Sequence, residues 1–542
     1  MSRNSEKKFG IVPISQMERS KWEDKSGHIT AFNVGDIIPI YVNTDIMPGQ
    51  TIKMETAAVL RLSTPIYPTM DVLYLDYYWF FDPHRLEWEH WKAFNGENED
   101  GAWTQDVEYE VPKMNAPAGG AATGTVMDYM GIPIGIPGID FNALAFRAYT
   151  RIYNEWFRDQ NLIAPAPRHR DDTTRTASNT DPWLGGKPFK AAKQHDYFTS
   201  GLPQPQKGAA VSMPLGTSAP VKTGTENLGM FPATPTIIKT TTGANPAQNV
   251  TLGAGNATTG YSLGAGPTGT AYTDRYVFTN LYADLTEATA ATINALRLST
   301  QIQRILEKDA RGGTRYVEII KNHFGVVSPD ARQQIPEYLG GKQHPFGVYQ
   351  VPQTESTNST SPQGNLAGFG HMEFREHSFT KSFTEHGTLI CLAVARHKHK
   401  YQQGLARMWK RRRRFDFYWP TLAHIGEQPR YMYEIYVQGN SQDNEVFMYQ
   451  EAWAEYRYTP SRTSGVMRST YSAPLDAWHY GDKYDSKPIY SQAFIEETPL
   501  YVDRTLAVKS NIQPQIIADF GFRFENVAPM PMYSVPGLMD HF

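Results

Sequence analysis

The feature that most constrains the fold is a succession of short strand-like segments separated by turn signals. Residues 51–56 alternate polar and apolar side chains, as in a strand with one buried face, and Pro48-Gly49 just before them marks a turn. Residues 72–81 form a long aromatic run that Asp82-Pro83 ends. Residues 387–395 are almost continuously apolar, which favours a strand buried on both faces.

Other segments extend this pattern along the chain. Further strands are predicted at residues 37–42, 414–419, 431–438, 448–458 and 507–517. Two segments show helical spacing instead: residues 142–161, with Leu144, Ala148, Ile152 and Trp156 on one side, and residues 284–310. We expect both apolar stripes to pack in the core. Many strands with long excursions and few helices indicate a β-sandwich of jelly-roll type.

Two further segments stand apart in composition. Residues 205–272 consist mainly of Gly, Ala, Thr, Pro and Asn, so they cannot bury a large core of their own. This stretch is also too long for an ordinary loop, and we expect a functional excursion on the surface. Residues 1–30 are polar and are predicted to form an extended N-terminal arm. Residues 31–542 are then a single domain that carries the insertions.

Composition excludes several classes of protein. The formal net charge of −3 provides no global basic field, so nucleic acid would have to bind a local patch. The single cysteine, Cys391, excludes an intrachain disulfide framework and fits folding in a reducing cytoplasm. We expect no signal peptide, because the first ten residues lack an apolar core, and no membrane insertion, because no apolar run approaches the length of a span.

The strongest charge feature is a run of five cations, Lys410 to Arg414, preceded by Arg407. Adjacent cations repel one another, so they favour a partner that supplies negative charge, and phosphate is the obvious one. Phe415, Phe417, Tyr418 and Trp419 follow directly and could stack on unpaired bases. Two alternatives stay open: a solvated turn, or arginines paired with acids across a subunit interface.

No pattern in the sequence indicates an active site. His397 and His399 could share one face of a strand, but no carboxylate lies near them in sequence, so a metal site is poorly supported. Glutamate and histidine are adjacent at 376–377 and 385–386, where neighbours on a strand point to opposite faces. We therefore predict no catalytic residue, metal or cofactor. A secreted sugar-binding sandwich would need a secretion signal, and a glycoside hydrolase would need a marked pair of carboxylates.

Several long blocks resemble the major capsid proteins of gokushoviruses, within the family Microviridae. The resemblance begins at residues 62–96, which include DVLYLDYYWFFDPHRLEWEHW, and continues in FRAYTRIYNEWFRDQNL at 146–162. It returns in HDYFTSGLPQPQKG at 195–208 and in RILEKDARGGTRYVEIIKNHFG from residue 304. It is dense again in CLAVARHKHKYQQGLARMWKRRRRFDFYWP from residue 391. These blocks span most of the chain, and the likeness is weakest in the Gly/Ala/Thr-rich segment.

The resemblance implies a viral, eight-stranded jelly-roll sandwich with large loop and helical insertions. It implies assembly through pentamers into a T=1 icosahedral shell around circular single-stranded DNA, in the cytoplasm of a bacterial host. The expected partners are other copies of the chain, an internal scaffolding protein, minor pilot and DNA-binding virion proteins, and a host surface receptor. Residues 205–272 fit the insertion that forms protrusions at the three-fold axes of such shells.

Within this interpretation, two sets of side chains are candidates for binding. The DNA-binding candidates are the cations Arg407, Lys410, Arg411, Arg412, Arg413 and Arg414. Interfaces between subunits are enriched in aromatic residues, and the candidates for them are Tyr78, Trp79, Trp88, Trp91 and Trp156. We expect these aromatic side chains to divide between the core and the interfaces.

Overall fold

The computed structural model describes residues 19–97, 108–209, 211, 293–313, 316–325 and 334–533, and the backbone of five short strands between 221 and 283. The chain divides into two compact units. The first comprises Met1–Pro205 and Asp309–Phe542, and the second comprises Gln206–Lys308. Residues 1–18 of the expected arm and most of the expected protrusion lie outside the described residues.

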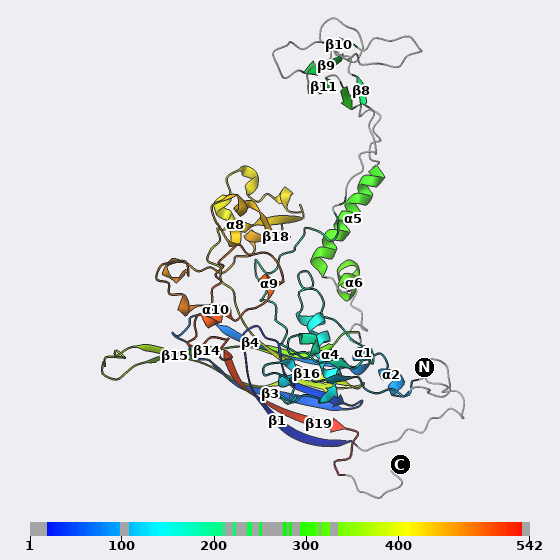
Figure 1. Ribbon diagram of the computed structural model, residues 1–542, viewed down its shortest axis with the longest axis vertical. Helices are drawn as coiled ribbons and strands as arrows, with labels where there is room; N and C mark the ends of the chain where they lie inside the picture. The colour runs from blue at the N-terminus through cyan, green and yellow to red at the C-terminus, as the bar shows by residue number, and fades with distance from the viewer. Residues whose placement is uncertain are drawn as a thin grey trace, which may run out of the picture. The chain divides into compact units, whose positions relative to one another are not determined.

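The first unit is built on two antiparallel sheets (Figure 1). One sheet has the order β1-β19-β3-β15-β14 and the other β13-β4-β16-β2. The strands of the first sheet are β1 Ser20–Phe32, β3 Thr51–Leu62, β14 Gly347–Pro352, β15 Leu366–Ser382 and β19 Ile516–Ala528. Those of the second are β2 Ile38–Ile46, β4 Leu73–Pro83, β13 Glu337–Pro345 and β16 Gly387–His397. The expected mainly β sandwich with insertions is therefore confirmed, and its order, which pairs strands far apart in sequence, is compatible with a jelly roll.

The main core lies between the two sheets and is lined by alternate residues of each strand. Met54 and Leu60 on β3 and Phe520 on β19 contribute from the first sheet, and Trp79 on β4 and Cys391 on β16 contribute from the second. The indole nitrogen of Trp79 donates a hydrogen bond to Thr56 Oγ1 at 3.1 Å. The buried indole thus keeps its polar atom satisfied.

A helical layer covers the other face of the second sheet. α4 (Leu144–Ile152) continues into a π-helical turn at Tyr153–Phe157, inside the segment predicted as a helix. The buried side chains of α4 pack with Ile390, Leu392 and Val394 of β16 in a second core. All residues from Gly387 to Ala395 are buried, which confirms the prediction of a strand buried on both faces. The apolar stripe of the helix is confirmed as core as far as Ile152, whereas Trp156 is 44% exposed.

The strands predicted at 37–42, 51–56 and 72–81 are confirmed as parts of β2, β3 and β4. Two other predictions, at 414–419 and 431–438, are wrong, because residues 414–416 form a 3-10 turn and residues 432–435 form helix α8 (Met432–Ile435). The prediction at 507–517 holds only at Ile516 and Ile517, where β19 begins. The prediction at 448–458 holds only where it overlaps β18 (Val446–Glu451). Some aromatic side chains at 414–419 and 431–438 are buried, such as Tyr433, and others are exposed, such as Phe415, so aromatic content alone does not identify a strand.

The insertion, residues 398–515 between β16 and β19, has its own small core, in which Tyr401, Ile435, Phe447 and Phe494 pack with Tyr197. The other short elements of the first unit lie outside its two main sheets. The strands are β5 Lys113–Asn115, β6 Asp140–Asn142, β7 Arg175–Thr176 and β17 Glu427–Tyr431. The helices are α1 His84–Glu87, α2 Trp91–Phe94, α3 Val126–Tyr129, α6 Tyr316–Phe324, α9 Gln492–Ile495 and α10 Leu500–Asp503.

At the N-terminal side, residues 20–30 of the expected arm lie in β1, which pairs with β19 along its whole length. In the second unit, the strands are β8 Val221–Thr223, β9 Thr236–Thr240, β10 Asn249–Thr251, β11 Arg275–Phe278 and β12 Leu281–Ala283.

Helix α5 (Ile293–Gly312) covers most of the second predicted helix, whose first residues lie outside the described part. Its apolar stripe was expected in the core, but this is wrong for the single chain. Leu296, Ile302 and Ile305 of this stripe are 47%, 39% and 51% exposed. Helical spacing identifies an apolar face without showing what covers it.

Candidate nucleic-acid interface

The run of cations lies in the insertion, on the connection between β16 and β17, and two 3-10 turns shape it. The turns span Arg407–Lys410 and Arg414–Asp416. The Asp416 carboxylate closes the second turn, because it accepts hydrogen bonds from the backbone N–H groups of Arg412 at 2.8 Å and Arg413 at 2.7 Å. These bonds lower the pKa of Asp416, so its charge stays beside the arginines.

Two of the predicted DNA-binding residues are held by acids within the same chain. Arg411 Nη2 lies 2.8 Å from Glu455 Oε1, and its side chain is only 11% exposed. Arg407 Nη1 lies 3.5 Å from Glu434 Oε1 and also donates to the backbone oxygen of Pro429. Arg411 also packs its guanidinium 4.3 Å from the centre of the Tyr456 ring. These two cations therefore serve the fold of the insertion.

Glu455 is the centre of this internal network. It also binds Arg430 at 2.6 Å, and the Arg430 side chain is fully buried. Burial raises the pKa of Glu455, but the charge and hydrogen bond of Arg430, together with the charge of Arg407, outweigh it, so the net pKa lies below the usual value. Nothing close to the arginines in sequence identifies Glu455, because 44 positions separate it from Arg411.

The remaining cations, Lys410 and Arg412 to Arg414, are exposed. Exposed aromatic side chains flank the run on both sides: Trp409 is 67% exposed and Phe415 is 70% exposed. The Arg414 guanidinium lies 4.7 Å from the centre of the Trp419 ring. Cations beside exposed aromatic faces are the combination by which proteins hold single-stranded nucleic acid without reading its sequence.

A cleft of about 360 Å³ adjoins this surface. Its walls include Arg407 and Trp409 from the cation segment, Tyr197 and Tyr401 from the insertion core, and Tyr458. Glu434 and Glu455 also line the cleft, so the Arg407 guanidinium in its aromatic wall is already paired with acids. Its volume lies within the range of roughly 300–1,000 Å³ that small-molecule sites occupy.

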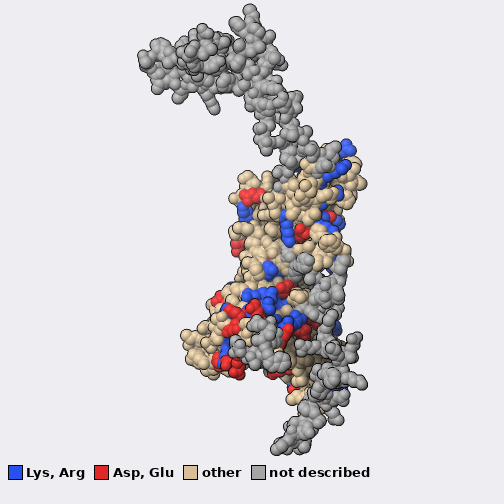
Figure 2. Space-filling model, turned by 90° about the vertical axis from the view of Figure 1, so that its right-hand side faces the viewer, with Lys and Arg blue, Asp and Glu red and all other residues tan. Residues whose placement is uncertain are grey.

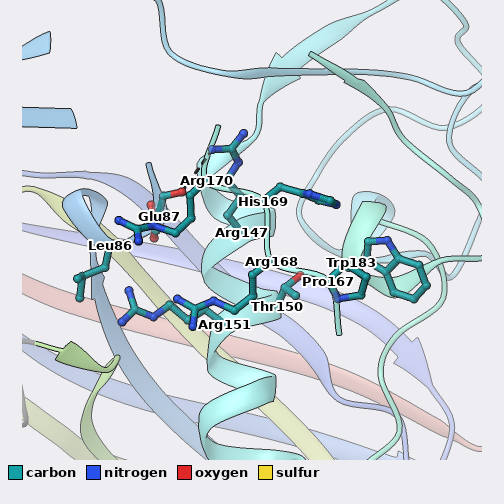
Figure 3. A pocket seen from close by; sticks show the side chains of 10 residues that line it. All are labelled: Leu86, Glu87, Arg147, Thr150, Arg151, Pro167, Arg168, His169, Arg170 and Trp183. Carbon is teal, nitrogen blue, oxygen red and sulfur yellow. Dashed lines mark hydrogen bonds between the residues drawn. The ribbon is translucent and has the colours of Figure 1, made fainter. Parts of the chain in front are cut away.

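A second group of arginines, which the sequence did not single out, lies around α4 (Figure 3). Arg147 and Arg151 project from the helix, and Arg168 and Arg170 come from the segment that follows it. Arg151 is buried and lies 3.2 Å from Asp82, whose pKa burial raises while the guanidinium opposes the rise. Arg147 donates to the backbone oxygens of Glu87 and Asp171. These arginines anchor the helix and leave a space of only about 20 Å³.

The predicted interface residues do not gather at one place. Trp79 and Trp88 are fully buried and belong to the interior. Tyr78 and Trp91 are partly buried, and the Tyr78 hydroxyl accepts a hydrogen bond from Arg396 at 2.8 Å. Trp156 is the most exposed of the five, and its indole donates to the backbone oxygen of Pro336 at 3.0 Å. On the face drawn in Figure 2, basic and acidic residues are interspersed rather than separated into one field.

Comparison with known proteins gives the class. Residues 10–538 match the family model of the phage capsid protein (F protein). This chain belongs to that family, a family of structural capsid proteins rather than enzymes. The protein is therefore a component of a phage virion, and the resemblance to gokushovirus capsid proteins is confirmed.

Three relatives match nearly the whole chain, and each is called Capsid protein VP1. The protein of Bdellovibrio phage phiMH2K is 43% identical over 100% of this chain and 99% of its own length. The protein of Spiroplasma virus 4 is 45% identical over 98% of this chain and 97% of its own length. The protein of Chlamydia phage 1 is 36% identical over 98% of this chain and 97% of its own length. Among the described residues, no helix is long and apolar enough to cross a membrane.

Proposed function

We propose that this capsid protein assembles through pentamers into a T=1 icosahedral shell that encloses circular single-stranded DNA, and that the exposed cations of residues 410–414 hold phosphates of that DNA. The observation that carries the DNA contact is the division of the cation run. Folding neutralises Arg407 and Arg411 with Glu434 and Glu455. Lys410 and Arg412 to Arg414 remain exposed beside aromatic rings.

The first experiment replaces Arg412, Arg413 and Arg414 together by glutamine in the full-length chain. We measure binding to a fluorescent oligothymidylate as a function of salt. Each phosphate contact contributes about −0.7 to the slope of log affinity against log salt for single strands. Because three contacts are removed, the slope for the variant should be less negative than that of the wild type by roughly 2. Trp409→Ala should weaken binding at every salt concentration, because stacking on a base is worth about 1–3 kcal/mol.

A matched control removes the same charge from the sandwich, with Lys21, Lys25 and Lys53 replaced by glutamine. These three lysines are exposed on β1 and β3. The proposal expects the control to keep wild-type DNA binding and to package genomes in infected cells, while the arginine variant forms shells that contain less DNA. Equal losses in both variants would show that total charge, rather than this turn, governs packaging. Normal packaging and salt stability of the arginine variant would refute the contact.

We further propose that residues 205–272 form a protrusion at the three-fold axes and take part in host attachment. The exposed apolar stripe of α5, in the same compact unit, supports this proposal, because such a face needs a partner and copies around a symmetry axis supply one. Deleting residues 210–270 should leave a folded chain that no longer supports binding of particles to the host. Normal infection by the deletion variant would refute the attachment role.

The remaining partners follow from the same proposal. An internal scaffolding protein would guide assembly, minor pilot and DNA-binding proteins would join the virion, and a host surface receptor would meet the protrusion. Trp156, which is half exposed, is the strongest candidate among the aromatic residues for a contact between subunits. Assembly would take place in the cytoplasm of the bacterial host.

A further inference from the structure

A buried cluster of histidines and carboxylates lies away from the cation run. It comprises His397, His399, Asp482 and Glu497, with Lys193 beside them. The side chains of the two histidines and the two acids are 0% exposed, and that of Lys193 is 3% exposed. Titratable groups are seldom buried to this extent unless they are paired with one another or bind a metal ion.

The fold brings three distant segments together to form this cluster. His397 ends β16 and His399 follows two residues later, so both rings lie on one side of the extended chain. Lys398 between them lies elsewhere, with its ammonium 5.4 Å from the centre of the Tyr74 ring. Asp482 lies 83 positions after His399, and Glu497 lies 98 positions after it. The sequence pattern therefore could not supply the acids that the two histidines lacked.

The donor atoms have the separations of ligands around one small ion. Glu497 Oε2 lies 3.1 Å from His399 Nε2, and Glu497 Oε1 lies 3.3 Å from His397 Nδ1. Donor atoms of His397, His399 and Glu497 all lie within 4.8 Å of one another. Two ligands bound tetrahedrally at the usual zinc distances are about 3.3 Å apart, so each histidine nitrogen lies at a fitting distance from one oxygen of Glu497, Oε2 for His399 and Oε1 for His397.

His397 is the residue that a pure hydrogen-bond network does not explain. Among the described residues, neither of its ring nitrogens has a hydrogen-bond partner, although the side chain is fully buried. Buried polar atoms are nearly always bonded, so an unbonded imidazole beside a carboxylate calls for a ligand.

The surroundings supply an outer layer of the kind that orients metal-bound histidines. His399 uses its other nitrogen, Nδ1, to contact Asp482 Oδ1 at 2.7 Å. Lys193 Nζ at 3.3 Å and the Tyr484 hydroxyl at 3.1 Å hold the second oxygen of Asp482. A carboxylate behind a histidine fixes which nitrogen carries the proton and leaves the other free for the metal. Lys193 thus pairs with the outer carboxylate and leaves Glu497 to the two histidines.

We propose that His397, His399 and Glu497 bind a divalent ion of the zinc class. The ion replaces the proton between His399 Nε2 and Glu497 and takes up Nδ1 of His397, the ring nitrogen that lies 3.3 Å from Glu497. Two histidines and one glutamate provide three protein ligands, and a water molecule completes the coordination. The site ties the end of β16 to the segment that follows α9, so its role is to stabilise the folded subunit.

The test uses the full-length chain after treatment with a chelator. Added Zn²⁺ should remain with the protein after gel filtration at one ion per chain, and it should raise the midpoint of thermal unfolding. Added Co²⁺ should give the visible absorption of a tetrahedral site. His397→Asn and Glu497→Gln should lose both effects, and Asp482→Asn should weaken binding roughly 10- to 100-fold through the outer layer.

The matched control is His377→Asn, which changes an exposed histidine of β15 and should bind zinc as the wild type does. Equal zinc content in His397→Asn and in the wild type would overturn the proposal, because the ion would then lie elsewhere. If the buried variants fail to fold, the wild type still decides the question. A folded wild-type chain that retains no zinc and gives no tetrahedral Co²⁺ spectrum overturns the site.

Discussion

Replacing Glu455 by glutamine should destabilise the insertion without changing its shape. The carboxylate lies 2.6 Å from Arg430, 2.8 Å from Arg411 and 3.8 Å from Arg407. Glutamine keeps the volume and removes the charge, which leaves the fully buried Arg430 without its counter-ion. Breaking a buried ion pair by removing one partner costs about 3–5 kcal/mol.

The structure places the expected cost of E455Q near the lower end of that range, at about 3 kcal/mol. Arg430 keeps a second hydrogen bond, to the backbone oxygen of Glu451 at 3.0 Å, and Arg407 keeps Glu434. A loss of about 3 kcal/mol changes the equilibrium between folded and unfolded chains roughly 100-fold. Urea unfolding of the full-length chain, followed by tryptophan fluorescence, measures this change.

Glu451→Gln is the matched control, because Glu451 pairs with Arg457 at the surface. The two side chains are 45% and 48% exposed, and such pairs contribute about 0.2–1 kcal/mol. The pH dependence supplies a further check on Glu455. Its pKa is lowered by folding, so its contribution is present above the ordinary pKa of 4.5 and is lost as the pH falls through the lower, folded value. The difference between the wild type and E455Q should therefore shrink in acid. If E455Q costs no more than the control at neutral pH, the arginines do not depend on Glu455.

Two further predictions concern the sandwich. Tyr149→Phe should lower the free energy of unfolding by about 1–3 kcal/mol, because the hydroxyl donates to Ile37 O at 2.7 Å and accepts from Phe189 N at 3.0 Å, and both hydrogen bonds are buried. Urea unfolding measures this change, and an unchanged midpoint would contradict the prediction. Burial lowers the pKa of His84, but Glu87 at 2.7 Å and the Thr44 carbonyl at 2.9 Å outweigh it by accepting from both ring nitrogens, so the net pKa is raised. The difference in unfolding free energy between the wild type and His84→Gln should therefore be largest below pH 6.5 and should shrink as the pH rises through the folded pKa of His84. Unfolding curves at several pH values measure this difference.

The sandwich was predictable from the sequence because its strands follow a local rule. Alternation in residues 51–56 and the continuous apolar run at 387–395 reflect one or two buried faces, and both strands form there. The same reasoning failed at 414–419 and 431–438, which are equally aromatic. Some of these aromatic residues are buried beside short turns, such as Tyr433, and others are exposed, such as Phe415, and no periodicity of the backbone records that arrangement.

The candidate sites show a second limit of prediction from the sequence, because the side chains that meet in each site lie far apart along the chain. The sequence identified the two histidines but not Asp482 or Glu497, and it identified the arginines but not Glu455. Side chains that meet across separate segments carry no local signal. Burial has the same effect on the aromatic candidates, since nothing in their own neighbourhoods separates the buried Trp79 from the exposed Trp156.

The division of the cation run also separates the interpretations that the sequence left open. If the whole run were a solvated turn, Arg411 would not be packed between Glu455 and the Tyr456 ring. Folding uses the acids in reach, Glu434, Glu455 and Asp416, and still leaves Lys410 and Arg412 to Arg414 exposed. The folded turn holds an excess of exposed positive charge in place. Such a surface favours a partner that brings several negative charges at regular spacing. A phosphate backbone supplies these at every nucleotide, whereas an acidic patch on a neighbouring subunit would have to match the turn residue by residue. Binding of the isolated chain to oligothymidylate therefore distinguishes a DNA contact from a subunit contact, because only the DNA contact requires no second subunit.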